Sequence, residues 1–211
     1  DFASLTAGRM ALTFGSGRIL GDNDWDNGIG AGTSSNTWDG LLFGINNDFA
    51  DVHVGYSATD LSDAYDASMM FANISKDMGN MGFNLLYVST QEEVGGSDKV
   101  SMGLDATYEM DNGAVLSLGY YTNDNNGTEM DLTSLGVSYG VNDDLSISYG
   151  EREVEFDKPS GTNVTESGEG IAIAYTMGSM KIAGNKNEVS DNDGTAGSND
   201  EMTEIAVSFA F

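Results

Sequence analysis

The clearest pattern in the chain is the alternation of side chains over its last eight residues, 204–211. Every second residue is apolar and the residues between are mostly small or polar, so the two kinds fall on opposite faces of an extended strand. The apolar face comprises Ile205, Val207, Phe209 and Phe211. Such a strand is half-buried, either against the core of a sandwich or in a barrel wall with lipid outside and water inside.

Segments of the same kind recur along the whole chain. They predict about twelve strands, at residues 2–14, 38–46, 49–58, 68–76, 82–90, 100–110, 114–122, 130–140, 145–156, 170–177, 180–189 and 204–211. Short links such as Asp111-Asn112-Gly113, a strong hairpin signal, alternate with long polar loops. Long loops at one end and tight turns at the other are typical of outer-membrane barrels. The sequence therefore predicts an all-β, antiparallel up-and-down transmembrane β-barrel that occupies residues 1–211 as one domain.

Charged residues within the strands favour a water-filled interior over a dry core. Asp105 and Glu109 alternate with apolar residues in one predicted strand, and Arg152 does so in another. A dry core would not accept these charges, whereas a wet lumen does. We therefore assign all three residues to the wall of a pore. The segments at about 38–45 and 82–90 are apolar on both faces, which indicates a subunit contact or a position beneath a loop folded into the lumen.

The composition adds a strong negative charge. The chain has 8 Lys and Arg against 34 Asp and Glu, a formal net charge of -26, and no cysteine. Such a charge repels phosphates and attracts cations, so nucleic acid is a poor partner. The lack of cysteine argues against a disulfide-stapled fold and thiolate metal sites. No run of about 18 apolar residues is present to form a transmembrane helix.

Motifs for catalysis and metal binding are weak. His53 is the only histidine, and a hydrolase would need a histidine base beside its nucleophile, so we interpret it as a wall residue and expect no enzyme. The run 22–28 begins like a calcium loop but lacks Gly at its sixth position and Glu at its twelfth. A loosely bound Ca²⁺ at Asp22, Asp24 and Asp26 stays open, with diffuse cations as the alternative.

Two stretches resemble Gram-negative outer-membrane porins. The opening run Asp1–Arg9, DFASLTAGR, resembles the "F-G-x-L-T-x-G-R" strand that in this family precedes a long, inward-folded third loop. The last third, with its hairpin at 175–179 and its ending Ser-Phe-Ala-Phe, is similar to porins of alphaproteobacteria. The resemblance implies a homotrimeric channel in the bacterial outer membrane, surrounded by lipid and lipopolysaccharide, through which small hydrophilic solutes and cations diffuse passively.

The resemblance also bears on the number of strands. In sixteen-stranded porins the Gly-Arg strand is the fifth, so twelve strands would remain from there to the end. The chain then corresponds to part of a sixteen-stranded barrel that lacks its first four strands, with a complete twelve-stranded barrel as the alternative. The start of the sequence directly within a strand favours the first interpretation.

The same resemblance places residues 15–36 inside the pore as its constriction loop. Asp22, Asp24 and Asp26 would then line the narrowest point, where rings of carboxylates select cations. Arg9 would face this loop from the barrel wall, and Arg18 would pair with the carboxylates. A solvated acidic loop outside the membrane is the alternative for this segment.

Two other functions compete with a cation-preferring channel. One is an outer-membrane adhesin or ligand-binding surface protein that binds through its acidic external loops. The other is a soluble acidic β-protein, which would dissolve without detergent.

Replacing Asp22, Asp24 and Asp26 together by Asn tests the constriction loop. We expect a weaker preference for cations, and a smaller loss when the last long loop is neutralised instead, because a narrow site is screened less by salt. Reversal potentials in a salt gradient measure both effects. A triple variant with the reversal potential of the parent would move this loop out of the pore.

Overall fold

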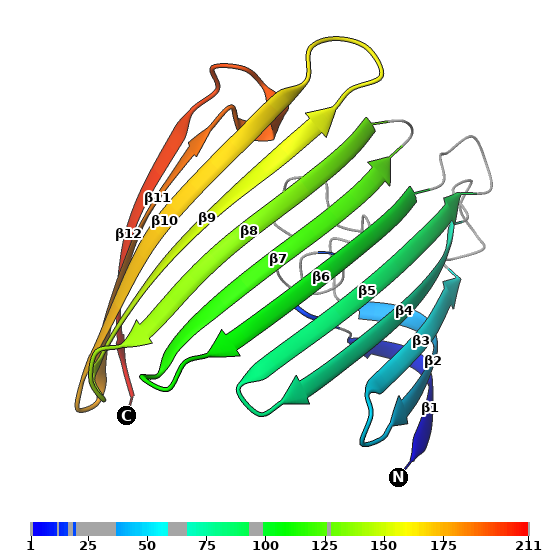
Figure 1. Cartoon of the computed structure of the whole chain (residues 1–211), viewed down its shortest axis with the longest axis horizontal. Helices are drawn as coiled ribbons and strands as arrows, with labels where there is room; N and C mark the ends of the chain where they lie inside the picture. Colours follow the sequence, from blue (N-terminus) through cyan, green and yellow to red (C-terminus); the bar gives the residue numbers. More distant parts are fainter. Residues whose placement is uncertain are drawn as a thin grey trace. The chain divides into compact units, whose positions relative to one another are not determined.

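The fold is that of a computed structural model, which describes residues 2–11, 13–16, 19, 37–58, 67–92, 99–125 and 128–210. Within these ranges the chain forms one antiparallel sheet of twelve strands whose spatial order follows the sequence (Figure 1). The strands are β1 (Ala3–Ala11), β2 (Thr37–Asn46), β3 (Asp51–Ala58), β4 (Ala67–Met78), β5 (Met81–Glu92), β6 (Lys99–Glu109), β7 (Ala114–Asn125), β8 (Thr128–Gly140), β9 (Leu145–Asp157), β10 (Val164–Met177), β11 (Met180–Ser190) and β12 (Asp200–Phe209), with one 3-10 turn, η1 (Asn192–Gly194), before β12. The predicted all-β, up-and-down topology is confirmed.

Strand ends differ from the prediction mainly on the side of the long connections. β10 begins at Val164 instead of residue 170, because its first residues pair with the polar end of β9, Val164 with Phe156 and Glu166 with Val154. β12 likewise begins at Asp200, which pairs with Val189 of β11. These extensions are polar, so hydrophobic alternation could not predict them. The strands continue beyond the apolar segment because backbone pairing continues.

The chain divides into two compact units, and each is described by itself. The first comprises residues 1–106 and 120–131, and the second comprises residues 107–119 and 132–211. Among the described helical residues, no helix is long and apolar enough to cross a membrane.

In the first unit, the two faces of the strands are clearly distinct. The register pairs Leu5 with Phe43, Phe43 with Val54 and Val54 with Ala72, so these residues share one face, and its large side chains are exposed. The opposite face, called here the packed face, carries the buried side chains Ser57, Met69, Phe71, Asn73, Leu86, Val88 and Ser101. The packed face therefore buries a mixture of polar and apolar side chains, whereas the opposite face leaves large apolar side chains exposed.

The second unit shows a different contrast. Ile147 pairs with Ile173, and Ile182 pairs with Val207, on a face whose apolar side chains are exposed. The other face, called here the small-residue face, is lined in register by Ser146, Ser148, Ala172, Ala174, Ala183 and Ala206. An exposed apolar face that continues across neighbouring strands needs an apolar environment.

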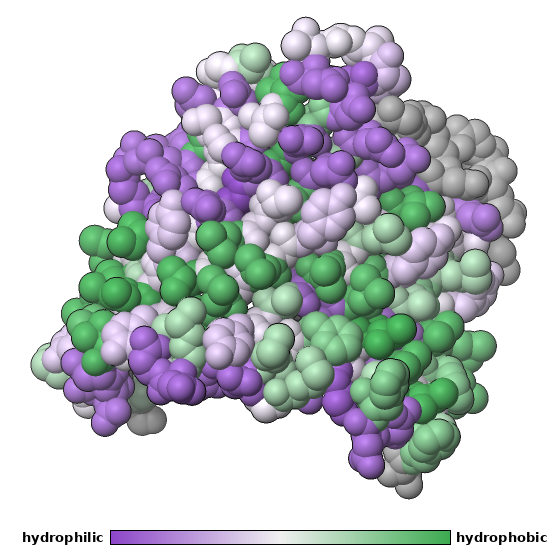
Figure 2. All heavy atoms as spheres, viewed as in Figure 1, coloured by the Kyte–Doolittle hydropathy of each residue, from purple (hydrophilic) through white to green (hydrophobic). Residues whose placement is uncertain are grey.

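The exposed face of the second unit changes from apolar to acidic along its strands. Toward the long connections it carries Glu151, Glu153, Glu155, Glu169, Glu188 and Glu201. Tyr149 lies at the boundary, where its hydroxyl donates to Glu169 at 3.0 Å and Glu151 at 3.3 Å. Figure 2 shows hydrophobic side chains in the middle of the strands and hydrophilic ones toward the long connections. The apolar band thus ends at an aromatic residue, as in membrane-spanning barrels.

The tight turns follow the local signals in the sequence. In the link between β6 and β7, the Met110 N–H donates to the Ala114 carbonyl at 2.8 Å, and Gly113 adopts a φ of 79°. Only glycine adopts this left-handed conformation without cost. The hairpin predicted from Asp111-Asn112-Gly113 is therefore confirmed.

Replacing Ile173 by Lys tests whether the exposed apolar face contacts lipid. A charge in the middle of a lipid-facing band costs about 2–4 kcal/mol, so the urea midpoint of unfolding from lipid vesicles should fall. The matched control is Ala172→Lys, which places the same charge on the small-residue face and should cost much less. Equal losses for the two variants would contradict the assignment of the faces.

Candidate functional site

The segment that follows β1, described at residues 13–16 and 19 and called here the inward segment, lies against the packed face. A cluster of hydrogen bonds holds it there. The Ser16 N–H donates to Asp105 Oδ2 at 3.1 Å, and Ser16 Oγ lies 2.7 Å from the Tyr121 hydroxyl. That hydroxyl also donates to Asp105 Oδ1. One carboxylate in β6 and one phenol in β7 therefore tie the segment to two neighbouring strands. Charge-assisted hydrogen bonds of this kind are stronger than neutral ones.

Glycine at position 15 lets the segment approach the wall closely. Gly15 has a φ of 57°, and a Cβ there would collide with the side chains of Asp105 and Asn84. A larger residue would therefore be strained and would push the segment away from β5 and β6. The glycine is needed for both its conformation and its size.

Apolar contacts hold the segment on either side of this cluster. The ring of Phe14 lies 5.4 Å from that of His53 and 5.3 Å from that of Phe71, centroid to centroid. Ile19 is buried, and a Cβ on Gly103 would lie 2.7 Å from its Cδ1. His53 thus lies on the packed face of β3 as a partner of Phe14. Aromatic and aliphatic packing supplements the hydrogen bonds to Asp105.

A hollow of about 420 Å³ remains between the segment and the wall. It is lined by Thr13, Phe14, Gly15, Leu42, His53, Asn73, Ser75 and Asn84. Leu42 therefore lies beneath the inward segment, and in β5 Leu86 and Val88 are buried on the same packed face. Strands that are apolar on both faces are expected to lie at a subunit contact or beneath an inward-folded loop. The second explanation accounts for Leu42 of β2, which lies beneath the inward segment.

The predicted constriction residues have different outcomes. Arg18, Asp22, Asp24 and Asp26 lie outside the described residues. Arg9 is described, and its register partner is Asp39, on the exposed face that also carries Leu5 and Leu41. This position corrects the expectation that Arg9 faces the loop from the wall. The inference failed because Gly, Ala and Thr on both sides of this strand hide its parity.

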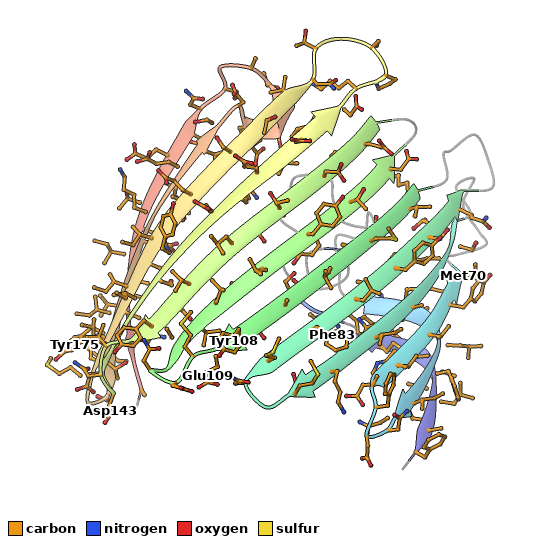
Figure 3. All side chains as sticks on the ribbon, viewed as in Figure 1. Met70, Phe83, Tyr108, Glu109, Asp143 and Tyr175 are labelled. Atoms are coloured by element: carbon orange, nitrogen blue, oxygen red, sulfur yellow. The ribbon has the colours of Figure 1, made fainter. Side chains whose placement is uncertain are left out.

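Two of the three predicted wall residues, Asp105 and Arg152, are part of anchoring contacts. Asp105 binds the inward segment on the packed face. Arg152 lies on the small-residue face of β9, where its Nη2 donates to Glu166 Oε1 at 2.5 Å; their side chains are 9% and 0% exposed. Gly168 is the register partner of Arg152 and leaves room for its guanidinium. Glu109 lies at the tight-turn end of β6, where it is exposed (Figure 3).

Sequence reasoning missed three residues that these contacts bring forward. Tyr121 is a large aromatic residue in line with Ser117 and Gly119, a contrast that could have marked it as a contact on the inner face. Glu166 fell in a predicted loop, although Glu166, Gly168 and Gly170 already alternate with polar partners. Ser16 carries no signal, because its role depends on residues about 90 and 105 positions away.

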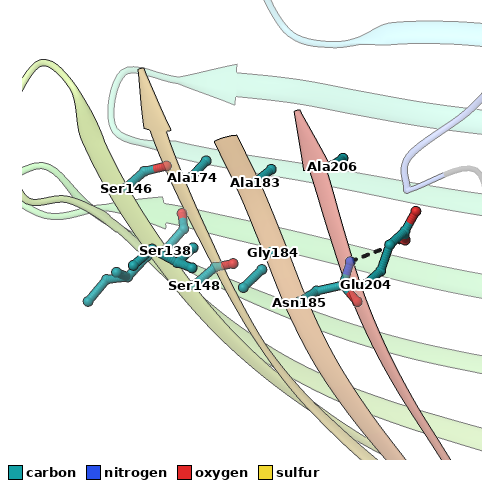
Figure 4. Close-up of a pocket in the computed structure, with 12 residues that line it drawn as sticks. Ser138, Ser146, Ser148, Ala174, Ala183, Gly184, Asn185, Glu204 and Ala206 are labelled. Atoms are coloured by element: carbon teal, nitrogen blue, oxygen red, sulfur yellow. Dashed lines mark hydrogen bonds between the residues drawn. The ribbon is translucent and has the colours of Figure 1, made fainter. Parts of the chain in front are cut away.

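The small-residue face is hollowed in the second unit. A hollow of about 300 Å³ is lined by Ser138, Ser146, Ser148, Ala172, Ala174, Ala183, Asn185, Glu204 and Ala206, together with Ile147, Ile173 and Gly184 (Figure 4). Asn185 Nδ2 lies 3.5 Å from Glu204 Oε2. Most side chains that line this hollow are short, and hydroxyl, amide and carboxylate groups lie among them.

The packed face and the small-residue face, together called the inner faces, carry more carboxylates than basic side chains among the described residues. On the packed face of the first unit, Asp51, Asp77 and Asp105 stand against Lys99. On the small-residue face of the second, strands β9 to β12 place Glu166, Asp200 and Glu204 there against Arg152 and Lys181. Because Arg152 and Glu166 neutralise each other, Glu204 and Asp200 outweigh Lys181. Among the described residues, each of the two faces therefore carries a net negative charge.

The whole chain, residues 1–211, matches the model of a family described as Gram-negative porin. No curated protein sequence matches it closely enough to count.

Solved outer-membrane proteins share the fold. The outer-membrane expressed OmpT of Vibrio cholerae aligns with a TM-score of 0.67 and 14% identity over 96% of this chain and 74% of that chain. An OmpT variant with loop L8 deleted aligns with a TM-score of 0.68 and 16% identity over 98% and 75%. The trimer form of in-vitro folded OmpT gives 0.68 and 11% identity over 98% and 76%. At these identities the likeness is one of fold.

The adjacent tyrosines of β7 offer a matched test of the anchoring cluster. Tyr121→Phe removes the hydroxyl that contacts Ser16 and Asp105, which should lower the free energy of unfolding by about 1–3 kcal/mol. Tyr120→Phe removes a hydroxyl that donates to Asp131 at 3.2 Å in an exposed contact, and should cost less than about 1 kcal/mol. Amide exchange of Ser16 should quicken in the first variant alone, and an unchanged rate there would disprove the anchor.

Proposed function

Because this chain belongs to the Gram-negative porin family, we propose that it forms a water-filled channel through which small hydrophilic solutes and ions diffuse passively, without a chemical step. It is a transmembrane β-barrel protein of the bacterial outer membrane. The observation that carries the proposal is the segment folded onto the packed face by Ser16, Asp105 and Tyr121. A segment that covers the packed face of a membrane-spanning sheet would narrow a water path along that face.

The narrowest point belongs to the residues that continue this segment. We assign residues 15–36 to a constriction loop, with Asp22, Asp24 and Asp26 as its cation-attracting groups and Arg18 as their internal partner. The anchor at Ser16 supports this assignment, since it starts the loop against the packed face. A Ca²⁺ ion held loosely by the three aspartates would reduce their effect on monovalent cations.

The channel prefers cations. Support comes from the net charge of -26 and from the unneutralised carboxylates on the inner faces, Glu204 and Asp200 among them. Carboxylates along a narrow aqueous path raise the local concentration of cations and lower that of anions. This preference falls at high salt, when the screening length drops below about 10 Å.

The channel assembles as a homotrimer with lipid and lipopolysaccharide around it. The trimer form of OmpT, which shares the fold, supports this assembly. Within the first unit, exposed Leu41, Phe43 and Val54 would contact either lipid or a second copy of the chain. In the second unit, the outward glutamates beyond Tyr149 would lie at the level of the lipopolysaccharide headgroups. A monomer mass in mild detergent would remove the trimer from the proposal.

Single-channel recording in planar bilayers tests the proposed function. We expect ohmic steps and, in a salt gradient, a reversal potential of the sign for cations. At a constant concentration ratio this potential should shrink as the dilute solution is raised toward about 1 M salt, because screening weakens the selectivity. Vesicles containing the protein should also admit small neutral sugars. Inserted protein that passes neither ions nor sugars would overturn the proposal, and a reversal potential of the opposite sign would overturn the cation preference alone.

A further inference from the structure

The connection between β11 and β12 folds back onto the small-residue face of the second unit. Gly194 is buried against Phe156 of β9: a Cβ at this position would lie 2.8 Å from the Cγ of the ring. Lys158 Nζ donates to the Gly194 carbonyl at 2.8 Å. The connection, residues 191–199, therefore has one apolar and one polar contact with the wall.

A buried carboxylate provides the third contact. Glu166 is 0% exposed, and each of its oxygens has a partner. Oε1 accepts from Arg152 Nη2 at 2.5 Å, and Oε2 accepts from the Asp193 N–H at 2.9 Å. A carboxylate taken out of water is tolerated only when both its charge and its lone pairs are satisfied. The backbone of Asp193 thus completes an arrangement that Arg152 alone would leave half satisfied.

The connection is also fixed internally. Asp191 Oδ1 accepts from the Gly197 N–H at 2.6 Å, and the Asn192 N–H donates to the Ser198 carbonyl at 2.7 Å. Asp191 and Asp193 have φ values of 56° and 53°, a left-handed conformation that non-glycine residues keep only when their surroundings impose it. These bonds hold a short connection in one shape, with the side chain of Asp193 exposed.

From these contacts we infer that residues 191–199 form a second inward element of the channel, that Glu166 is its positioning residue, and that Asp193 helps to select cations. This inference rests on the proposed function, because it takes the small-residue face to line the water path. Glu166 acts through the connection and does not meet the ion, whereas the Asp193 carboxylate stands in the path. The ligand that the Asp193 carboxylate attracts is a hydrated cation that passes through the channel.

The absence of cysteine from the chain allows a direct test. In Asp193→Cys the cation-to-anion permeability ratio should fall about fourfold at low salt, because one unit charge about 10 Å away in water changes the concentrations of the cation and of the anion by about twofold each, in opposite directions. Reaction with a cationic methanethiosulfonate reagent should lower the ratio again by a similar factor, and an anionic reagent should restore it. The matched control is Glu153→Cys, on the exposed face of β9, whose modification should leave conductance and selectivity unchanged.

The outcomes separate this inference from the proposed function. The inference alone would be overturned if the parent channel conducts and mass spectrometry shows full labelling of Asp193→Cys, but the labelled variant keeps the selectivity of the parent. A parent protein that inserts but does not conduct would overturn the proposed function. Equal effects of the reagents on the Asp193 and Glu153 variants would show a charge effect without a defined path, and would also overturn the inference.

A spin label on the same cysteine tests the positioning role. A nitroxide attached to Asp193→Cys should give the broad spectrum of an immobilised label. Adding Glu166→Gln should sharpen that spectrum to the form of a mobile label. Lys158→Met, which leaves the buried pair intact and is the safer variant to fold, should give a smaller shift in the same direction. A spectrum unchanged in both variants would overturn the tether, as would a label already mobile in the parent background.

Discussion

Everything in this protein depends on one constraint, the two-residue period of a strand whose faces need opposite environments. In the second unit, Ile147, Ile173 and Ile182 must lie in an apolar medium, while Ser146, Ala174 and Ala183 border a hollow that water can enter. A slip of one residue in any pairing would exchange the two sets. The cost of charged groups in lipid therefore fixes the register, and the register decides which residues meet the passage.

Segments that return to the inner face are held by charge-assisted hydrogen bonds. In the first unit Asp105 receives the Ser16 N–H, and in the second Glu166 receives the Asp193 N–H. In both cases a carboxylate on a rigid strand accepts from the backbone of a connection, which is a precise way to position a loop. Asp105, a predicted pore-wall charge, and Glu166 thus serve as anchors. The exposed Glu204, whose partner is the neutral amide of Asn185, is the better candidate for meeting ions.

Hydrophobic alternation was sufficient to predict the topology, because each strand with one lipid-facing side shows the same alternation of apolar and polar residues. It could not place residues that depend on distant partners. Alternation places Asp105 on the face opposite the apolar residues of its strand, but its partners Ser16 and Tyr121 come together only in the folded chain. Glu166 was lost in a predicted loop, because polar strand ends carry no apolar signal. Arg9 was misplaced since its strand is small on both faces, so parity there had to come from the pairing with Asp39.

The central claim, water on one face of the sheet and lipid on the other, is tested most directly by a cysteine scan along β10 in lipid bilayers. A water-soluble thiol reagent and a lipid-attached fluorescence quencher are applied to single cysteines at positions 171 to 175. The account predicts that positions 172 and 174 react with the soluble reagent, while labels at 171, 173 and 175 are quenched from the lipid. Uniform reactivity along the strand, or quenching at 172 and 174, would contradict it.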